Sequence, residues 1–122
     1  MNLYRIISND EWTETKANGK VPRCASDKRA GFIHLNKFDD IENVANKYFV
    51  KDENPIVLEI DITKNLSKKL HWELPTKGKN WEQAHLKIDN IEIKFIKRFS
   101  YLISNSQKNN EFKIDQFKEL HI

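Results

Sequence analysis

The sequence contains little cysteine, glycine or proline. In 122 residues there are a single cysteine, Cys24, three glycines and three prolines. One cysteine cannot form a disulfide within the chain, so nothing favours an oxidising compartment. Nowhere do about 18 apolar residues follow one another, and residues 1–7 lack the basic and apolar regions of a signal peptide. We therefore expect a cytoplasmic protein that has no membrane partner.

A strong excess of one charge is also missing. The 21 basic residues exceed the 18 acidic residues by three, and they are spread along the chain. Only four of the basic residues are arginines, and lysines suit solubility better than bidentate recognition of phosphate. Nucleic acid is therefore a less favoured partner, although it remains an alternative. The sequence leaves the oligomeric state open.

Apolar residues are numerous enough for one folded core. They make up 39% of the chain, and a chain of 122 residues buries roughly two thirds of its unfolded surface. We expect one α+β domain over residues 1–103. Residues 104–122 begin with a polar stretch, after which Ile114, Phe117 and Leu120 recur at helical spacing. This pattern predicts a polar linker and a short C-terminal helix.

Alternation of apolar and polar residues predicts five strands. They are expected at residues 3–7, 31–36, 56–62 and 70–74 and from residue 91 onward. The strands at 56–62 and 70–74 are expected to be adjacent or nearly so. Ile96 interrupts the alternation of the last strand, which predicts a β-bulge there.

Two helices are expected between these strands. Ser8 and Glu11 have the spacing of a capping box, and Gly19 ends the helix that they begin. Asp39 and Glu42 predict a second capping box before the clearest apolar stripe of the sequence. The residues of this stripe, which we expect to be core, are Ile41, Val44, Ala45, Tyr48 and Phe49.

His34 is the first candidate for a catalytic residue. In a strand it shares a face with Phe32 and Asn36, whereas Ile33 and Leu35 lie on the other face. An imidazole at such a position needs hydrogen-bond partners if it is buried. Two interpretations follow: a core histidine bonded to the backbone, or a histidine that faces a polar cleft.

Glu73 is the second candidate for a catalytic residue. It lies on the polar face of the strand expected at 70–74, where a carboxylate could stabilise positive charge on a sugar or act as a general base. The alternative is an exposed glutamate without a role. If the two strands share a cleft, Glu73 and His34 lie on the same side of it.

The remaining titratable residues give no metal or nucleophile motif. The four histidines, His34, His71, His85 and His121, have no spacing typical of zinc ligands, so we expect no metal. Cys24 stands in a loop without a histidine nearby and is expected to be an inert thiol. The three glycines are too scattered for a phosphate-binding loop.

Several blocks, in their order and spacing over residues 1–99, resemble the bacterial family called domain of unknown function 952. The block Gly31-Phe32-Ile33-His34-Leu35 is the most specific of them. The others are Trp12, Gly19, residues 44–49, residues 57–61, Trp72-Glu73 and His85.

The resemblance implies an ADP-ribosyltransferase-like fold, in which a split, mostly antiparallel sheet with a few packed helices forms a cleft. In other proteins of this fold the cleft holds NAD or a related ADP-ribose compound, which makes NAD a candidate substrate here. By this likeness His34 would bind a ribose hydroxyl, and Glu73 would stabilise an oxocarbenium ion or a reacting hydroxyl. Arg23 would hold phosphate. Asn36 and His85 are further candidates for ligand binding.

The chain departs from the family pattern at Ala30, Asn36 and Asp40 and, His85 excepted, throughout residues 83–88, where family members carry Phe-Pro-His-Ile-Tyr-Gly. Family members carry Ser, Gln and Tyr where this chain has Asn36, Asp40 and Lys87, and an acidic residue where it has Ala30. Because a fold does not fix a function, two hypotheses stay open. The first is a nucleotide or ADP-ribose-type ligand cleft, as in an NAD-dependent ADP-ribosyl transferase or a related phosphoribosyl-type transferase. The second is a non-catalytic module that binds a protein or a nucleic acid.

Overall fold

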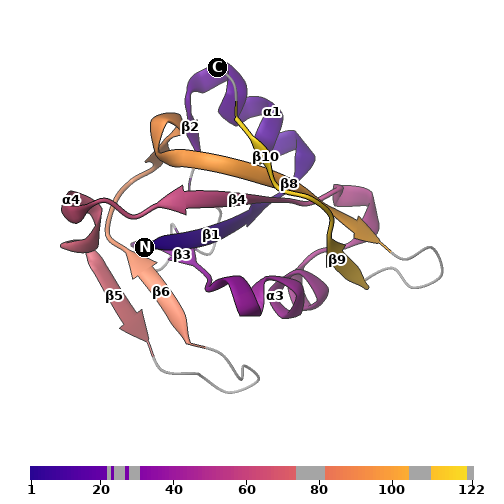
Figure 1. Cartoon of the computed structure of the whole chain (residues 1–122). Helices are drawn as coiled ribbons and strands as arrows, with labels where there is room; N and C mark the ends of the chain where they lie inside the picture. Colours follow the sequence, from indigo (N-terminus) through magenta and orange to yellow (C-terminus); the bar gives the residue numbers. More distant parts are fainter. Residues whose placement is uncertain (22, 24–26, 28–30, 74–81, 105–110, 121–122) are drawn as a thin grey trace.

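Strand β4 (Ile56–Asp61) is the centre of the larger antiparallel sheet (Figure 1). The computed structural model describes residues 1–21, 23, 27, 31–73, 82–104 and 111–120. β4 pairs with β1 (Asn2–Ile7) on one side and with β8 (Ile96–Ser104) on the other. The far edge of β8 pairs with β10 (Lys118–Glu119), and its C-terminal end pairs with β9 (Phe112–Ile114).

A second antiparallel sheet carries the polar residues singled out above. Its order is β3 (Ile33–Leu35), β6 (Gln83–Leu86) and β5 (Leu70–Glu73). The two sheets meet where Tyr4 of β1 and Asn36, just after β3, exchange both main-chain hydrogen bonds at 2.8 Å. We call this junction the seam. A two-stranded ribbon of β2 (Lys20–Val21) and β7 (Ile91–Glu92) completes the strands described.

The helices begin and end at the expected kinds of residue. Helix α1 (Asn9–Asn18) starts at the capping box of Ser8 and Glu11 and ends at Gly19, whose φ of 76° is the left-handed conformation that glycine favours. Helix α3 (Ile41–Tyr48) follows a 3-10 turn over Phe38–Asp40, and α4 (Lys64–Ser67) is a single turn. No helix in the described part of the chain is long and apolar enough to cross a membrane.

Both faces of the larger sheet are covered by apolar side chains. On one face Ile56, Leu58 and Ile60 of β4 pack with residues of the second sheet, such as Ile33 and Leu35. The other face of the sheet packs against α3 and β9. Its buried residues are Tyr4, Ile6, Ile41, Val44, Ala45, Val57, Leu102 and Phe112. The predicted α+β class with mostly antiparallel strands and few helices is confirmed.

The prediction that the strands at 56–62 and 70–74 are adjacent or nearly so is wrong. β4 pairs with β1 and β8, whereas β5 belongs to the other sheet and pairs with β6. Similar alternation in two strands shows that each has one apolar face, but it does not select a partner. Leu74, the expected end of the second strand, lies outside the described residues.

The predicted C-terminal helix is also wrong, because this part of the chain contains strands β9 and β10. Three apolar residues at helical spacing are too few for a helix to be stable without packing. Helix α3 instead supplies acceptors for the free edge of β9. Asn46 Oδ1 accepts from the Phe112 main-chain N at 2.5 Å, and Glu42 Oε2 accepts from the Ile114 N at 2.9 Å.

Two details of the second helix differ from the prediction. Asp39 and Glu42 form no capping box, since Asp39 lies in the 3-10 turn and Glu42 bonds to β9. Of the apolar stripe, Ile41, Val44 and Ala45 are buried, and Phe49, just beyond the last helical residue, is partly buried and packs against them; Tyr48 is 50% exposed.

The last long strand is interrupted close to the expected position. A 3-10 turn over Ile93–Phe95 separates β7 from β8. Glu59 then faces Arg98 while Ile60 faces Ile96, so the register shifts at Lys97. The irregularity predicted at Ile96 is therefore present, in the form of a turn followed by a register shift.

Candidate functional site

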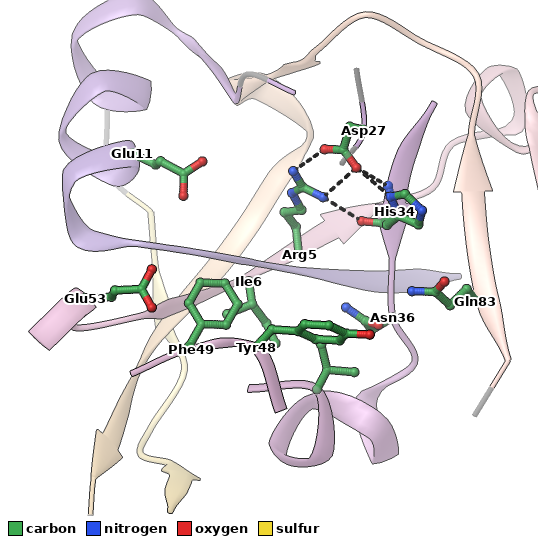
Figure 2. A pocket seen from close by; sticks show the side chains of 11 residues that line it. Arg5, Ile6, Glu11, Asp27, His34, Asn36, Tyr48, Phe49, Glu53 and Gln83 are labelled. Atoms are coloured by element: carbon green, nitrogen blue, oxygen red, sulfur yellow. Dashed lines mark hydrogen bonds and ion pairs between the residues drawn. The ribbon is translucent and has the colours of Figure 1, made fainter. Parts of the chain in front are cut away.

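A cavity of about 360 Å³ lies at the seam between the two sheets (Figure 2). Strands β1 and β3, helices α1 and α3, and the segment after α3 all contribute side chains to it. Its lining residues in the described part of the chain are Arg5, Ile6, Glu11, Asp27, His34, Asn36, Val44, Tyr48, Phe49, Glu53 and Gln83. Polar groups therefore surround an apolar and aromatic floor, which is typical of a small-molecule site.

One wall of the cavity is a buried ion pair between Arg5 and Asp27. The Arg5 Nη2 binds Asp27 Oδ2, and the Arg5 Nη1 donates to the His34 carbonyl at 3.0 Å and to Asp27 Oδ1 at 3.4 Å. Asp27 is fully buried and the Arg5 side chain is nearly so. Since unpaired buried charges are costly, each residue needs the other.

Asp27 also fixes His34. Its Oδ1 lies 2.6 Å from the His34 ring Nδ1 and accepts from the His34 main-chain N at 3.1 Å. A carboxylate can only accept, so in the neutral ring the proton is on Nδ1 and Nε2 is an acceptor. A histidine oriented in this way can accept a hydrogen bond from a hydroxyl or take its proton.

The other histidines of the second sheet line up beside His34. The register places His34 opposite His85, and His85 opposite His71, so all three side chains lie on one face. The His85 ring is buried, stacks on Phe32 at 3.9 Å, and meets His34 edge-on at 4.9 Å. His85 therefore packs against the His34 ring and is not among the residues that line the cavity.

Glu73 lies on the same sheet face as His34 but outside the cavity lining. It stands opposite Gln83 on β6, and its Oε1 is 3.8 Å from the His85 Nδ1. Glu73 and His34 share a sheet face, but they do not line one cavity as expected, because β6, which carries His85, lies between their two strands. Among the described residues, His85 lies between Glu73 and His34 and contacts both.

Arg23 and Asn36, the other two predicted ligand-binding residues, have different positions. Arg23 donates to the Ile88 and Gly31 carbonyls and pairs with Asp89 at 3.2 Å, away from the cavity lining. Asn36 lines the cavity and is 6% exposed. Its Oδ1 has no hydrogen-bond partner among the described residues.

The departures from the family pattern are equally dispersed. Asn36 and Gln83 belong to the cavity, while Asp40 and Lys87 are not among its lining residues. Burial raises the pKa of the Asp40 carboxyl above its usual value. Ala30 lies outside the described residues, as do Cys24 and His121. Within the described residues, no group of three or more His, Cys, Asp or Glu could hold a metal ion.

Sequence reasoning missed Arg5, Asp27, Glu11 and Glu53. A signal for the first pair was present: Arg5 is a charged residue inside an apolar strand, and such a residue needs a partner when it is buried. Asp27 is the only acidic residue between Glu14 and Asp39. Glu11 and Glu53 each cap the first turn of a helix by accepting from the main-chain N of Ser8 and Val50, and nothing in the sequence indicates that they also line a cavity.

A separate charged group crosses the larger sheet and is not part of the cavity lining. The Tyr4 hydroxyl donates to Glu59 Oε2 at 2.9 Å, and Arg98 binds both Glu59 oxygens at 2.8 Å. Hydrogen bonding from Arg98 lowers the pKa of the Glu59 carboxyl. Burial, with the neighbouring Glu59, raises the pKa of Tyr4 to about 12. The group joins three neighbouring strands, which indicates a structural role.

Comparison with known proteins identifies related chains. A family model described as protein of unknown function, DUF952, matches residues 6–92. A crystal structure of protein CC0527 from Caulobacter crescentus is 26% identical, with a TM-score of 0.76 over 93% of this chain and 94% of that one. The solution structure of CC0527 is also 26% identical, with a TM-score of 0.72 over 90% and 91%. A search of curated proteins finds no match.

Proposed function

Because the chain belongs to the DUF952 family, whose description states no activity, we propose its function from the cavity. We propose that the cavity binds the ribose of a nucleotide or ADP-ribose-type ligand. His34 accepts a hydrogen bond from a ribose hydroxyl in this proposal. The observation that carries it is the 2.6 Å contact between Asp27 Oδ1 and His34 Nδ1, which leaves Nε2 as an acceptor.

The rest of the lining supports this ligand class. Asn36 and Gln83 add amide groups that can bind further hydroxyls, and Tyr48 and Phe49 add aromatic surface on which a base can stack. The volume of about 360 Å³ is within the range of small-molecule sites. Two antiparallel sheets that meet at one seam, with the cavity there, also agree with the proposed ADP-ribosyltransferase-like fold.

In the catalytic form of this proposal the protein is an ADP-ribosyl transferase that uses NAD as a substrate. The bond between ribose and nicotinamide breaks, the acceptor hydroxyl forms a new bond to the ribose carbon, and nicotinamide leaves. Because the neutral ring has a single acceptor, His34 Nε2 in this form takes the proton of the acceptor hydroxyl in place of the hydrogen bond from the ribose, and Asp27 stabilises the charged ring. Glu73 is too far out on the sheet to touch the ribose in this arrangement.

A non-catalytic module is the second candidate, and the position of Glu73 favours it. A transferase needs a group that stabilises positive charge on the sugar. The carboxylate predicted for that role contacts His85 instead of lining the cavity. A module of this kind binds its ligand, or a partner that carries it, without turnover.

Thermal denaturation with adenosine, ADP-ribose and NAD tests the proposal. We expect at least one of them to raise the melting temperature of the wild-type chain and H34A to weaken its binding by about 1–3 kcal/mol. H71A is the matched control, because His71 is exposed on the same sheet face outside the cavity lining. If none of the three ligands stabilises the protein, the proposal fails.

Chromatographic detection of nicotinamide released from NAD separates the two candidates. A transferase releases nicotinamide at a rate that H34A lowers by about a hundredfold or more, whereas H71A leaves it unchanged. A binding module shows the thermal shift without release.

A further inference from the structure

Helix α3 faces the cavity with one flank and strand β9 with the other. Successive helical residues are roughly 100° apart around the axis, so positions 44 and 48 fall nearly opposite positions 42 and 46. Val44 and Tyr48 line the cavity. Glu42 and Asn46 bond to β9, which lies beside α3 in Figure 1. The helix therefore connects the cavity with a strand that contributes no residue to the described lining.

The spacing of the two acceptors on α3 matches the spacing of two main-chain N–H groups of β9. Glu42 and Asn46 are four residues apart, which is roughly 6 Å along a helix. Phe112 and Ile114 are two residues apart, which is roughly 6.6 Å along a strand. Both bonds therefore form at once, at 2.9 Å from the Ile114 N to Glu42 Oε2 and at 2.5 Å from the Phe112 N to Asn46 Oδ1.

Apolar packing adds to the contact between α3 and β9. Phe112 is 1% exposed and belongs to the same buried cluster as Ile41, Val44 and Ala45. The helix has little stability of its own, because it is 8 residues long and Asp40 at its N-cap makes no side-chain capping bond. The position of α3 therefore depends on the elements that pack against it, and β9 is one of them.

From these contacts we infer that β9 fixes the wall of the cavity that α3 forms. Glu42 and Asn46 are positioning residues, which touch no ligand and act through Val44 and Tyr48. For its ligand the inference rests on the proposed function, because a base that stacks on Tyr48 needs this wall in place. Binding in the cavity and docking of β9 then favour each other, since both require the same position of one helix.

The variant N46A tests the inference without a ligand. It removes the acceptor of the Phe112 N, so the last turn of α3, which carries Tyr48, should open more often. Amide hydrogen exchange at Phe49 measures this opening, because the Phe49 N donates to the Ala45 carbonyl at 2.9 Å. We expect Phe49 to exchange about fivefold faster or more in N46A. Alanine is a better helix former than asparagine, so a change of helix propensity would have the opposite effect.

Matched variants on the same helix are the controls. N43A makes the same substitution at an exposed position to which the structure assigns no bond with the described residues of β9, and it should leave Phe49 exchange unchanged. At Glu42 the comparison is between alanine and glutamine. E42A removes the acceptor of the Ile114 N and should accelerate Phe49 exchange, whereas E42Q keeps an acceptor and should not.

Calorimetric titration of the full chain with adenosine, ADP-ribose and NAD measures the effect on binding. We expect N46A and E42A to weaken the binding of the ligand that wild type takes up by about fivefold or more. L66A is the control for a general loss of stability, because Leu66 is buried in the other core cluster. It should destabilise the protein and keep the wild-type affinity.

The outcomes separate this inference from the proposed function. Phe49 exchange that N46A leaves unchanged overturns the inference, and so does a loss of affinity that L66A reproduces. A ligand that binds N46A and E42A as tightly as wild type leaves the ribose site standing and overturns the inference. Faster Phe49 exchange in N46A and E42A, in a protein that binds none of the three ligands, supports the inference and overturns the proposed function.

Discussion

His34 gives two hydrogen bonds to a single oxygen of Asp27, one from its main-chain N at 3.1 Å and one from its ring Nδ1 at 2.6 Å. The carboxylate therefore fixes the strand and the ring together. Because the other oxygen of Asp27 binds Arg5, a residue in each sheet depends on this one buried acid. The orientation of His34 is a property of the whole Arg5–Asp27–His34 group.

Replacing Asp27 with Asn should destabilise the protein by about 3–5 kcal/mol. The substitution leaves the Arg5 guanidinium buried without its counter-charge, which is costly in a dry environment. Urea denaturation of wild-type and D27N protein measures the loss.

The double variant R5M/D27N is the control for this prediction. Removing both charges should recover much of the stability that D27N loses, because the unpaired cation is gone. If D27N alone costs less than about 1 kcal/mol, the pair does not have the role assigned to it here.

Helix α3 should respond to truncation at its buried end and not at its exposed end. I41A should cost about 2–5 kcal/mol because Ile41 is fully buried against the sheet. Y48A should cost about 1 kcal/mol or less, since half of its side chain is exposed and the remainder borders the cavity. Chemical denaturation gives both values, and a larger cost for Y48A would contradict this packing.

The stability of the protein should fall between pH 10 and pH 12 through Tyr4. Its pKa is about 12 in the folded state and 10.0 ordinarily, so the unfolded chain loses this proton first. Folding therefore gains from the neutral phenol below pH 10, and that gain is lost as the pH rises toward 12. Urea denaturation across this range should show the advantage of wild type over Y4F shrinking. A constant difference between the two proteins would contradict the prediction.

The C-terminal segment should behave as part of the core. F112A should cost about 3–5 kcal/mol, because Phe112 is 1% exposed and packs against α3 and the larger sheet. The exposed neighbour Lys113 offers a control, and K113A should change the free energy of unfolding by about 0.5 kcal/mol or less. Full stability after removal of residues 105–122 would show instead that this segment is dispensable.

Local patterns predicted the elements whose causes are local. The capping box of Ser8 and Glu11, the stop at Gly19 and the alternation around Leu58 each depend on residues a few positions apart, and all appear in the structure. Strand pairing depends on contacts between distant residues, so the partner of β5 could not be read from its own alternation. The C-terminal strands were missed for the same reason, since β8 and α3 determine their conformation.

The same distinction applies to the candidate site. His34 and Asn36 were found because a polar position on a strand is visible in a short window of sequence, and both line the cavity. Asp27 reaches His34 from a segment that gives no regular pattern, and Glu11 and Glu53 look like caps alone. The sequence signal that would have led to Asp27 is an arginine, Arg5, inside an apolar strand, since such a residue needs an acidic partner if it is buried.

The seam between the sheets has a consequence for motion. In the described part of the chain, one residue pair, Tyr4 and Asn36, provides the main-chain hydrogen bonds between β1 and the β3 segment. A contact this short can open without breaking the pairing inside either sheet, so amide hydrogen exchange at Tyr4 and Asn36 should be faster than at Leu58, deep in β4. A ligand that touches Arg5 and His34 bridges the two sheets, and it should slow exchange at this pair more than anywhere else.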